Sequence, residues 1–410
     1  MKKSLLCAVA VLFFFALSIF AVHEAEAVPA FARQTGLACN SCHFQHFPAL
    51  NSFGRAFKDG GYTQVGGQSL VEGDLLSVPV VLNASLVTKI RYQKKNGDAE
   101  TDINKGEFQF PDEAALLIGG RAGEHVGFLL ESSLIGELNS DSFASFKMPI
   151  VFNVSGINLS AIPFTTDAAG AAYGYELLNT GAVRMTRVLE HRRETSGQQY
   201  IGTDGAATGL SLVASKPIGY VNYTAYYPEH GSAAAGPLLN YFRVAATPQV
   251  GNWDLAGGFQ LWNGTSKTGD GAGAVQQKAD AWAIDAQAQG TVGNYPVGVY
   301  VTYASAASSD TNDIENMFNS STVDDETALT LLGEVGVIPG RLTLAAGYRL
   351  GKNGDPNDDG QDSDDAATVG AVYNAMQNVQ LQFNHTIYSG DVTTDASGDQ
   401  LTTLMLFAAF

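Results

Sequence analysis

The feature that most limits the fold is an alternation of apolar and polar side chains that runs from about residue 83 to the C-terminus. In the segment 378–389, Leu381, Phe383 and Ile387 share one face, and Gln382 and Asn384 share the other. A repeat of two residues is the period of a β-strand whose faces meet different surroundings. The pattern predicts an all-β fold with sixteen strand segments, at 83–94, 108–122, 126–136, 142–154, 157–165, 206–214, 219–228, 238–247, 252–263, 278–289, 295–305, 326–336, 340–350, 366–375, 378–389 and 398–410.

The connections between these segments alternate in length. Tight turns such as 123–125, 290–294 and 376–377 alternate with long loops at 95–107, 166–205, 264–277, 306–325 and 351–365. Short turns at one end and long loops at the other are typical of outer-membrane barrels, whose even strand number puts both chain ends on the periplasmic side. We predict a transmembrane outer-membrane β-barrel of about 16 antiparallel strands, surrounded by outer-membrane lipid. The alternative is a soluble β-sandwich or β-helix with buried aromatic residues.

Two features of the strand ends support a membrane barrel. The chain ends in Phe410, and a terminal aromatic residue on a closing strand resembles the end signal of bacterial outer-membrane barrels. Aromatic residues near strand ends are typical of the two interfacial girdles of such barrels. Those near the predicted strand ends are Tyr220, Tyr223, Tyr226, Tyr227, Trp253, Trp262, Tyr295 and Tyr348.

The N-terminus has the form of an export signal. Lys2 and Lys3 precede an apolar run at 5–22, and Ala25-Glu26-Ala27 has the small-x-small form that signal peptidase cleaves. We expect residues 1–27 to be a signal peptide that is cleaved after Ala27; a retained membrane anchor is the alternative. After this run no window holds 18 apolar residues, so a membrane role for the mature chain must use strands.

The charge of the chain indicates its partners. Asp and Glu number 41 against 23 Lys and Arg, for a net charge of -18, which disfavours nucleic acid because phosphate binding needs a basic face. The loop 351–365 alone holds six Asp. We expect this loop to concentrate cations at the barrel mouth by its charge, rather than to form a tight metal centre.

The chemistry of the chain is predicted by Cys39-Asn40-Ser41-Cys42-His43, which is C-x-x-C-H, the attachment sequence of c-type haem. From one helical turn, two thiols can reach two vinyl groups on one edge of the porphyrin, and the next residue can place its imidazole on the iron. The sequence therefore predicts one covalent haem c, with Cys39 and Cys42 as thioether anchors and His43 as the proximal iron ligand. The alternatives are a thiol–disulfide pair and half of a zinc site.

The haem segment is too short to have a large core of its own. We expect residues 28–75 to form a small helical plug that needs the lumen of a barrel at 76–410 as its wall. The haem would then cover the apolar side chains of this segment, which include Phe31, Leu37, Phe44, Phe47, Leu50, Phe53 and Phe57.

Residues 29–62, PAFARQTGLACNSCHFQHFPALNSFGRAFKDGGY, resemble the N-terminal signature of the fused outer-membrane cytochrome-porins of iron-oxidising bacteria. The layout of that family, one haem c followed by a barrel of roughly sixteen strands, would span the whole mature chain. The resemblance implies oxidation of ferrous iron at the outer membrane. Other predicted outer-membrane cytochromes with similar N-termini have no established link to iron, so the resemblance supports the haem more firmly than the substrate.

The sixth iron ligand is left open by the sequence. The main candidates are His46, His191 and Met185, of which His46 is only three residues from His43 and has a packing role as its alternative. The loop segment 181–194 could fold inward and bring Met185 or His191 to the iron, with Arg184, Arg187, Arg192 and Arg193 facing the propionates. Further candidates are His125, His230, Met148, Met317 and Met376, whereas His385 and Met405 are interpreted as barrel-wall residues.

These features together predict an outer-membrane electron-transfer cytochrome. We expect its haem to take one electron at a time from extracellular Fe(II) or another reductant and to pass it to a periplasmic c-type cytochrome, which would make the protein an iron oxidase. One alternative is export of electrons to an external acceptor. The other is a diffusion porin whose haem is structural.

Overall fold

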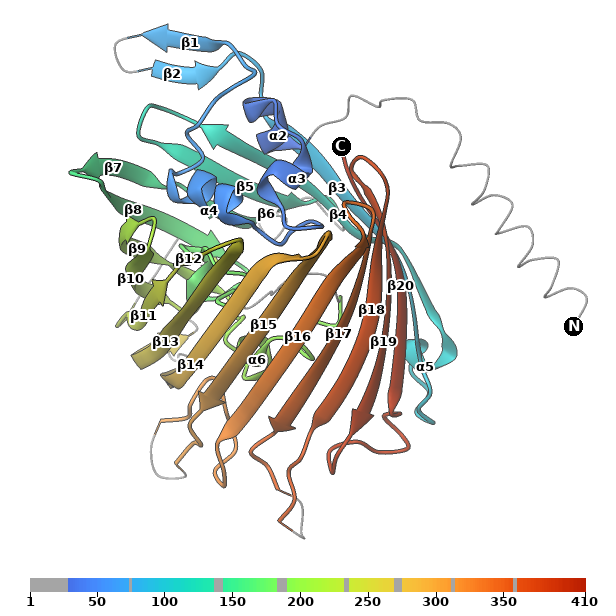
Figure 1. Cartoon of the computed structure of the whole chain (residues 1–410). Helices are drawn as coiled ribbons and strands as arrows, with labels where there is room; N and C mark the ends of the chain where they lie inside the picture. Colours follow the sequence, from blue (N-terminus) through green and yellow to red (C-terminus); the bar gives the residue numbers. More distant parts are fainter. Residues whose placement is uncertain are drawn as a thin grey trace, which may run out of the picture.

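The computed structural model describes residues 29–73, 76–135, 143–182, 190–231, 236–268, 275–310, 314–356 and 360–410. Its main body is a closed antiparallel barrel, and the short helices α2, α3 and α4 lie at one end of it (Figure 1). The predicted signal peptide and its cleavage site lie outside the described residues. None of the described helices is long and apolar enough to cross a membrane.

All sixteen predicted strand segments are confirmed. The barrel contains eighteen segments, but β6 and β7 both pair with β8, and β11 and β12 both pair with β13, so each of these pairs is one interrupted strand and the wall has sixteen positions. The segments are β3 (Ala84–Lys95), β4 (Glu107–Arg121), β5 (Gly127–Ser133), β6 (Phe143–Lys147), β7 (Ile150–Val154), β8 (Ile157–Thr166), β9 (Ala207–Lys216), β10 (Gly219–Tyr227), β11 (Leu239–Ala246), β12 (Gln249–Val250), β13 (Trp253–Thr268), β14 (Val275–Val292), β15 (Tyr295–Ala306), β16 (Glu326–Ile338), β17 (Leu342–Lys352), β18 (Asp365–Met376), β19 (Val379–Ser389) and β20 (Gln400–Ala409).

The two faces of the wall are those of a membrane barrel. On β19, Phe383 and Ile387 are 40% and 48% exposed, whereas Asn384 and Thr386 are 0% exposed. A soluble sandwich would bury its apolar side chains instead, so the soluble alternative is wrong. Polar side chains inside and apolar side chains outside are the pattern of an outer-membrane barrel.

The aromatic-girdle prediction is wrong for half of the residues named for it. Tyr223, Tyr295 and Tyr348 are exposed on the outer face, but Tyr220, Tyr226, Tyr227 and Trp262 are buried. Tyr226 and Trp262 belong to a core inside the lumen, where they pack with residues of the loop after β8. An aromatic residue near the end of a strand can point either toward the lipid or into the lumen. Its position near the strand end therefore does not show which of the two it does.

The lumen is filled from the long-loop side by the connection between β8 and β9. This connection includes the short helices η2 (Ala171–Tyr173) and α6 (Gly197–Tyr200), and most of its described residues are buried. α6 contacts β15 and β16 on the inside of the wall. The expectation that this loop could fold inward is therefore confirmed for its described part.

The N-terminal helices α2 (Ala30–Thr35), α3 (Cys39–Cys42) and α4 (Ser52–Asp59) lie at the opposite end of the lumen. They are followed by a hairpin of β1 (Leu70–Gly73) and β2 (Leu76–Pro79), which forms a separate two-stranded sheet in the described residues and lies beyond the end of the barrel in Figure 1. The hairpin spans the predicted domain boundary at residue 75, and the wall itself begins at Ala84. Figure 1 shows α2, α3, α4, the hairpin and the C-terminus at one end and the long loops at the other.

Contacts of the N-terminal segment define which end it occupies. Asp59 accepts hydrogen bonds from Asn158 and Ser215, beside the turns 155–156 and 217–218, and the Gln45 carbonyl accepts one from Asn374, beside the turn 377–378. All three are short turns, and short turns are periplasmic in such barrels. The C-x-x-C-H motif therefore lies in the periplasmic half of the lumen.

Candidate haem site

The C-x-x-C-H motif has the local geometry that attachment of haem c requires. α3 is a single helical turn from Cys39 to Cys42, closed by a 2.9 Å bond from the His43 amide to the Cys39 carbonyl. At His43 the helix ends and the backbone becomes extended, with φ -104° and ψ 138°. The two thiols thus share one turn, and the imidazole leaves it in a new direction.

Both thiols are free and half-buried. Burial raises the pKa of both Cys39 and Cys42, which keeps them as thiols rather than as the thiolates that redox-active or zinc-binding cysteines need. Among the described residues no cluster of three His, Cys, Asp or Glu side chains could hold a metal ion. The donor set therefore fits covalent haem better than a zinc site.

His43 is suited to iron coordination. Its Nδ1 is buried and has no hydrogen-bond partner among the described residues. Burial lowers its pKa to about 4, so the ring is neutral at ordinary pH, and neutral imidazole is the form that binds iron. The ring packs edge-on against Phe47, with 5.2 Å between ring centroids.

Asn51 fixes α4 against the motif. Its side-chain oxygen caps α4 by accepting from the Gly54 amide at 2.9 Å, and its side-chain nitrogen donates to the Ser41 carbonyl at 3.0 Å. The Asn51 amide also donates to the Cys42 carbonyl at 3.0 Å. Asparagine is among the most favourable capping residues, so one side chain starts the helix and positions the haem turn.

Gly54 is required by this close approach, because a Cβ there would lie 2.2 Å from the Cys42 carbonyl oxygen. We expect Gly54→Ala to move α4 away from the motif at a cost of about 1–3 kcal/mol, and to lower the haem-to-protein ratio of the purified protein. Gly205→Ala is the matched control, since nothing lies within 4 Å of a Cβ at that position. A full haem complement in Gly54→Ala would contradict this packing role.

His46 makes contacts that do not favour a role as the sixth ligand. Its Nε2 lies 2.7 Å from Glu334 Oε2, and its Nδ1 lies 3.1 Å from the Phe47 carbonyl, so both ring nitrogens are engaged. Burial lowers the pKa of His46, but the charge and hydrogen bond of Glu334 outweigh it and the net shift is upward. The pair joins the haem loop to β16, and Tyr300 donates to the other oxygen of Glu334 at 2.6 Å.

His191, in the connection between β8 and β9, packs against the inside of the wall, away from the C-x-x-C-H motif. Its two nitrogens are each 2.6 Å from a threonine hydroxyl, on Thr386 and Thr403. Thr403 is six residues along β20 from Ala409, which corresponds to about 20 Å. Ala409 marks the end of β20 nearest the motif, because its amide bonds to the Asn378 carbonyl and Asn378 Oδ1 lies 3.7 Å from Cys39 Sγ. His191 is therefore held against β20 far from the two cysteines.

The remaining loop candidates are placed only in part. Met185, Arg184 and Arg187 lie outside the described residues. Arg192 pairs with Glu190 at 2.9 Å, and Arg193 lies 3.7 Å from Glu326 at the long-loop end of β16 and over the ring of Tyr200, so both guanidinium groups contact protein side chains.

Three buried side chains attach the plug to the barrel, and sequence reasoning missed all of them. Gln34 donates to the Tyr62 carbonyl and accepts from Asn83, while Arg55 pairs with Asp254 on β13. Asn179 lies in the connection between β8 and β9, residues 167–206, which we call the inner loop; it bonds both to the amide and to the carbonyl of Leu50. In the sequence, Gln34 and Arg55 are recognisable only as polar residues within the apolar N-terminal segment, and this does not identify the residues that they contact.

The acidic loop after β17 is partly structural. Asp362 lies 3.2 Å from Lys352 Nζ, Asp364 pairs with Arg349, and Asp365 accepts from the Gly351 amide. Asp355 is exposed, and Asp358 and Asp359 lie outside the described residues. Three of the four described aspartates of this loop therefore have partners within the protein, so only part of the charge predicted to attract cations is available for that role.

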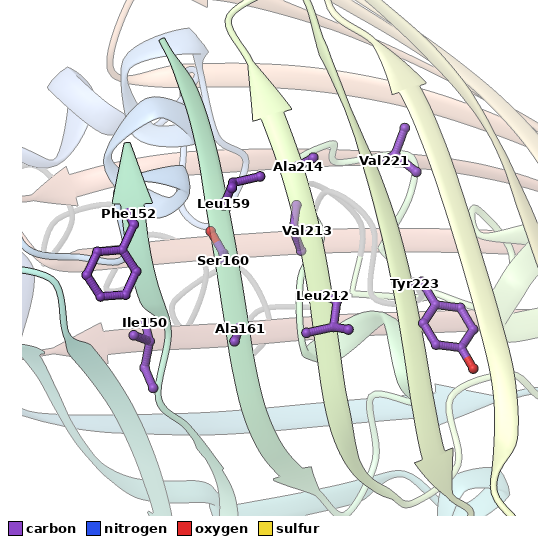
Figure 2. Close-up of a pocket in the computed structure, with 10 residues that line it drawn as sticks. All are labelled: Ile150, Phe152, Leu159, Ser160, Ala161, Leu212, Val213, Ala214, Val221 and Tyr223. Carbon is purple, nitrogen blue, oxygen red and sulfur yellow. The ribbon is translucent and has the colours of Figure 1, made fainter. Parts of the chain in front are cut away.

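An apolar groove on the outside of the wall is a lipid surface and not part of this site. Figure 2 shows it across β7 to β10, lined by residues that include Phe152, Leu159, Leu212 and Tyr223. These four side chains are 43–50% exposed on the outer face, where acyl chains would cover them.

Comparisons with known proteins place this chain beside solved outer-membrane barrels. No protein-family model matches the chain, and no curated protein matches it. A loop-deletion mutant of OmpT, an outer membrane protein of Vibrio cholerae, is 12% identical, with 80% of this chain and 99% of that chain covered and a TM-score of 0.49. A mutant of the Rh. blastica porin is 13% identical (80% and 100% covered, TM-score 0.46), as is OccK10 (OpdN) of Pseudomonas aeruginosa (82% and 99%, TM-score 0.46).

Proposed function

We propose that this protein is an outer-membrane electron-transfer cytochrome that oxidises extracellular Fe(II) and passes the electrons to a periplasmic c-type cytochrome. The observation that carries the proposal is the single-turn C-x-x-C-H helix, held inside the periplasmic half of a membrane barrel, with the His43 ring buried beside it and its Nδ1 without a hydrogen-bond partner among the described residues. Cys39 and Cys42 would hold haem c by two thioethers, and His43 would bind its iron. A bound haem c would supply reversible one-electron transfer through that iron.

The surrounding residues fit a conduit for electrons. Cys39 contacts Asn378 in a periplasmic turn, so one side of the motif lies close to the space where a soluble carrier diffuses. The plug and the inner loop meet inside the lumen, where Asn179 bonds to Leu50 and Lys58 donates to the Glu176 carbonyl. These contacts narrow the path for solutes and leave the plug firmly positioned.

Anaerobic addition of ferrous iron to the purified, oxidised protein tests the proposal. We expect the visible spectrum to change to that of reduced haem c at neutral pH. A haem-loaded protein that stays oxidised would remove Fe(II) as the donor. A titration with other one-electron reductants would then define what the haem accepts.

A diffusion porin with a structural haem is the second candidate, favoured by the barrel wall itself. The two functions differ in what crosses the membrane. In planar bilayers we expect conductance well below that of an open sixteen-stranded porin, because plug and loop occupy the lumen. Porin-like conductance in the haem-loaded protein would favour the second candidate.

The aspartates of the acidic loop after β17 for which no protein partner is described are expected to act on the rate of encounter with the cation. Replacing Asp355, Asp358 and Asp359 together by Asn should slow haem reduction by Fe(II) roughly two- to tenfold at low ionic strength. The difference should disappear at high salt, because salt screens exposed charges. Glu72→Gln, an exposed change in the hairpin at the opposite end, is the control. Loss of activity at every salt concentration would instead indicate a specific metal site in the loop.

A further inference from the structure

An apolar area on the inner face of the wall borders the haem motif. We call it the inner patch; it consists of the buried side chains of Val87, Ala115, Met405, Phe407 and Ala409, from β3, β4 and β20. The lumen-facing residues around it are polar, including Lys89 and Gln382. An apolar area on the polar inner face of a barrel indicates that something apolar lies against it.

The haem segment joins the inner patch at two points. The Phe47 ring stacks on Phe407, with centroids 5.2 Å apart, and the His43 ring packs on the same Phe47. At the end of β20, the Ala409 amide donates to the Asn378 carbonyl at 3.0 Å, and Asn378 Oδ1 contacts Cys39 Sγ. A porphyrin attached to Cys39 therefore starts at the edge of the inner patch.

Met405 is the residue of the inner patch that can bind iron. Its neighbours on the strand, Leu404 and Leu406, take the outer face, so the Met405 side chain, which is 3% exposed, faces the lumen. It lies four residues from Ala409, or about 13 Å along β20. Half the width of a porphyrin and the length of an unbranched thioether side chain together can cover that separation.

Three other candidates among the described residues, His46, His191 and Met376, are less well placed. His46 and His191 have both ring nitrogens engaged, by Glu334 and Phe47 and by two threonines respectively. Met376 is 55% exposed at the end of β18. Met405 packs with the apolar residues of the inner patch, and its partners on the neighbouring strands are Gln382 and Arg91. Its thioether sulfur is a ligand that the iron of a c-type haem accepts.

We propose that the porphyrin held by Cys39 and Cys42 lies against the inner patch, and that Met405 Sδ is its distal iron ligand. This inference rests on the proposed attachment of haem c and adds the sixth ligand to it. Histidine–methionine coordination raises the reduction potential of a c-type haem, so Met405 would set the potential at which the protein accepts electrons.

The test uses haem-loaded, full-length protein with Met405→Leu, a change that keeps the volume of the side chain and therefore the fold. In the ferric wild type we expect the weak far-red absorption band of a thioether–iron bond. In Met405→Leu we expect this band to disappear and the reduction potential to fall. Met405→His should restore a six-coordinate, low-spin spectrum at a potential below that of the wild type.

Met376→Leu is the matched control and should leave both the band and the potential unchanged. An unchanged spectrum and potential in haem-loaded Met405→Leu would overturn the inference while leaving the proposed function intact. Loss of the band in Met376→Leu, with Met405→Leu unaffected, would overturn it in favour of Met376. A wild type that is six-coordinate and low-spin but lacks the band, and that loses its sixth ligand in His191→Ala, would overturn it in favour of His191. Absence of haem from the wild type would overturn both the inference and the proposed function.

Discussion

Replacing Cys39 and Cys42 together by alanine is expected to abolish covalent haem while the barrel still folds. Neither thiol contributes to the barrel wall; among the described residues, the thiol of Cys39 approaches Asn378 Oδ1 at 3.7 Å. Haem staining after denaturing electrophoresis should therefore fall to background. The heat-dependent shift in gel mobility that reports a folded membrane barrel should remain.

Two control variants separate attachment from folding in that experiment. Cys42→Ala alone should retain part of the stain through the remaining thioether of Cys39. Cys7→Ala, in the predicted signal peptide, should have no effect. Haem that survives denaturation in the double variant would contradict the assignment of these two cysteines.

Replacing Arg243 by methionine is expected to cause the largest loss of stability. Arg243 on β11 is 0% exposed; it lies 3.1 Å from Glu176 of the inner loop and also pairs with Asp285 on β14. Methionine preserves much of the side-chain volume but leaves two carboxylates buried without their cation. Breaking a buried ion pair from one side typically costs about 3–5 kcal/mol.

The measurement is the urea concentration at which the barrel loses its folded gel mobility, compared with Lys352→Met. Lys352 is 63% exposed and pairs with Asp362 at 3.2 Å, so its removal should cost less than about 1 kcal/mol. Release of Glu176 should also free the inner loop and raise the conductance in bilayers. Equal stability of the two variants would show that Arg243 does not hold the loop in the lumen.

The barrel could be predicted from the sequence because each strand is identified by the order of its own apolar and polar residues. Each strand carries its own alternation, as in β19, and even the interrupted strand of β6 and β7 falls within one predicted segment, 142–154. The haem motif is local as well, since Cys39, Cys42 and His43 lie within one helical turn and the next residue.

The surroundings of the site could not be predicted, because they depend on how the barrel closes. His46 and Glu334 are 288 residues apart in sequence, and only the register of β16 brings them together. Met405 does belong to the wall, as expected, but the inner patch to which it belongs, and against which Phe47 packs, is formed by the pairing of β20 with β3. Inward-facing residues of different strands meet in the lumen without any shared sequence signal.

Electron transfer across a sealed membrane tests the central claim most directly. The haem-loaded protein would be inserted into lipid vesicles that enclose oxidised soluble cytochrome c, and ferrous iron would be added outside under anaerobic conditions. Vesicles enclosing a ferrous-iron chelator serve as the control for leakage. We predict that the enclosed cytochrome c is reduced while the chelator stays uncoloured, and that vesicles with the Cys39→Ala, Cys42→Ala variant show neither change. Colouring of the chelator as fast as cytochrome c is reduced, or no reduction at all by haem-loaded protein, would contradict an electron conduit.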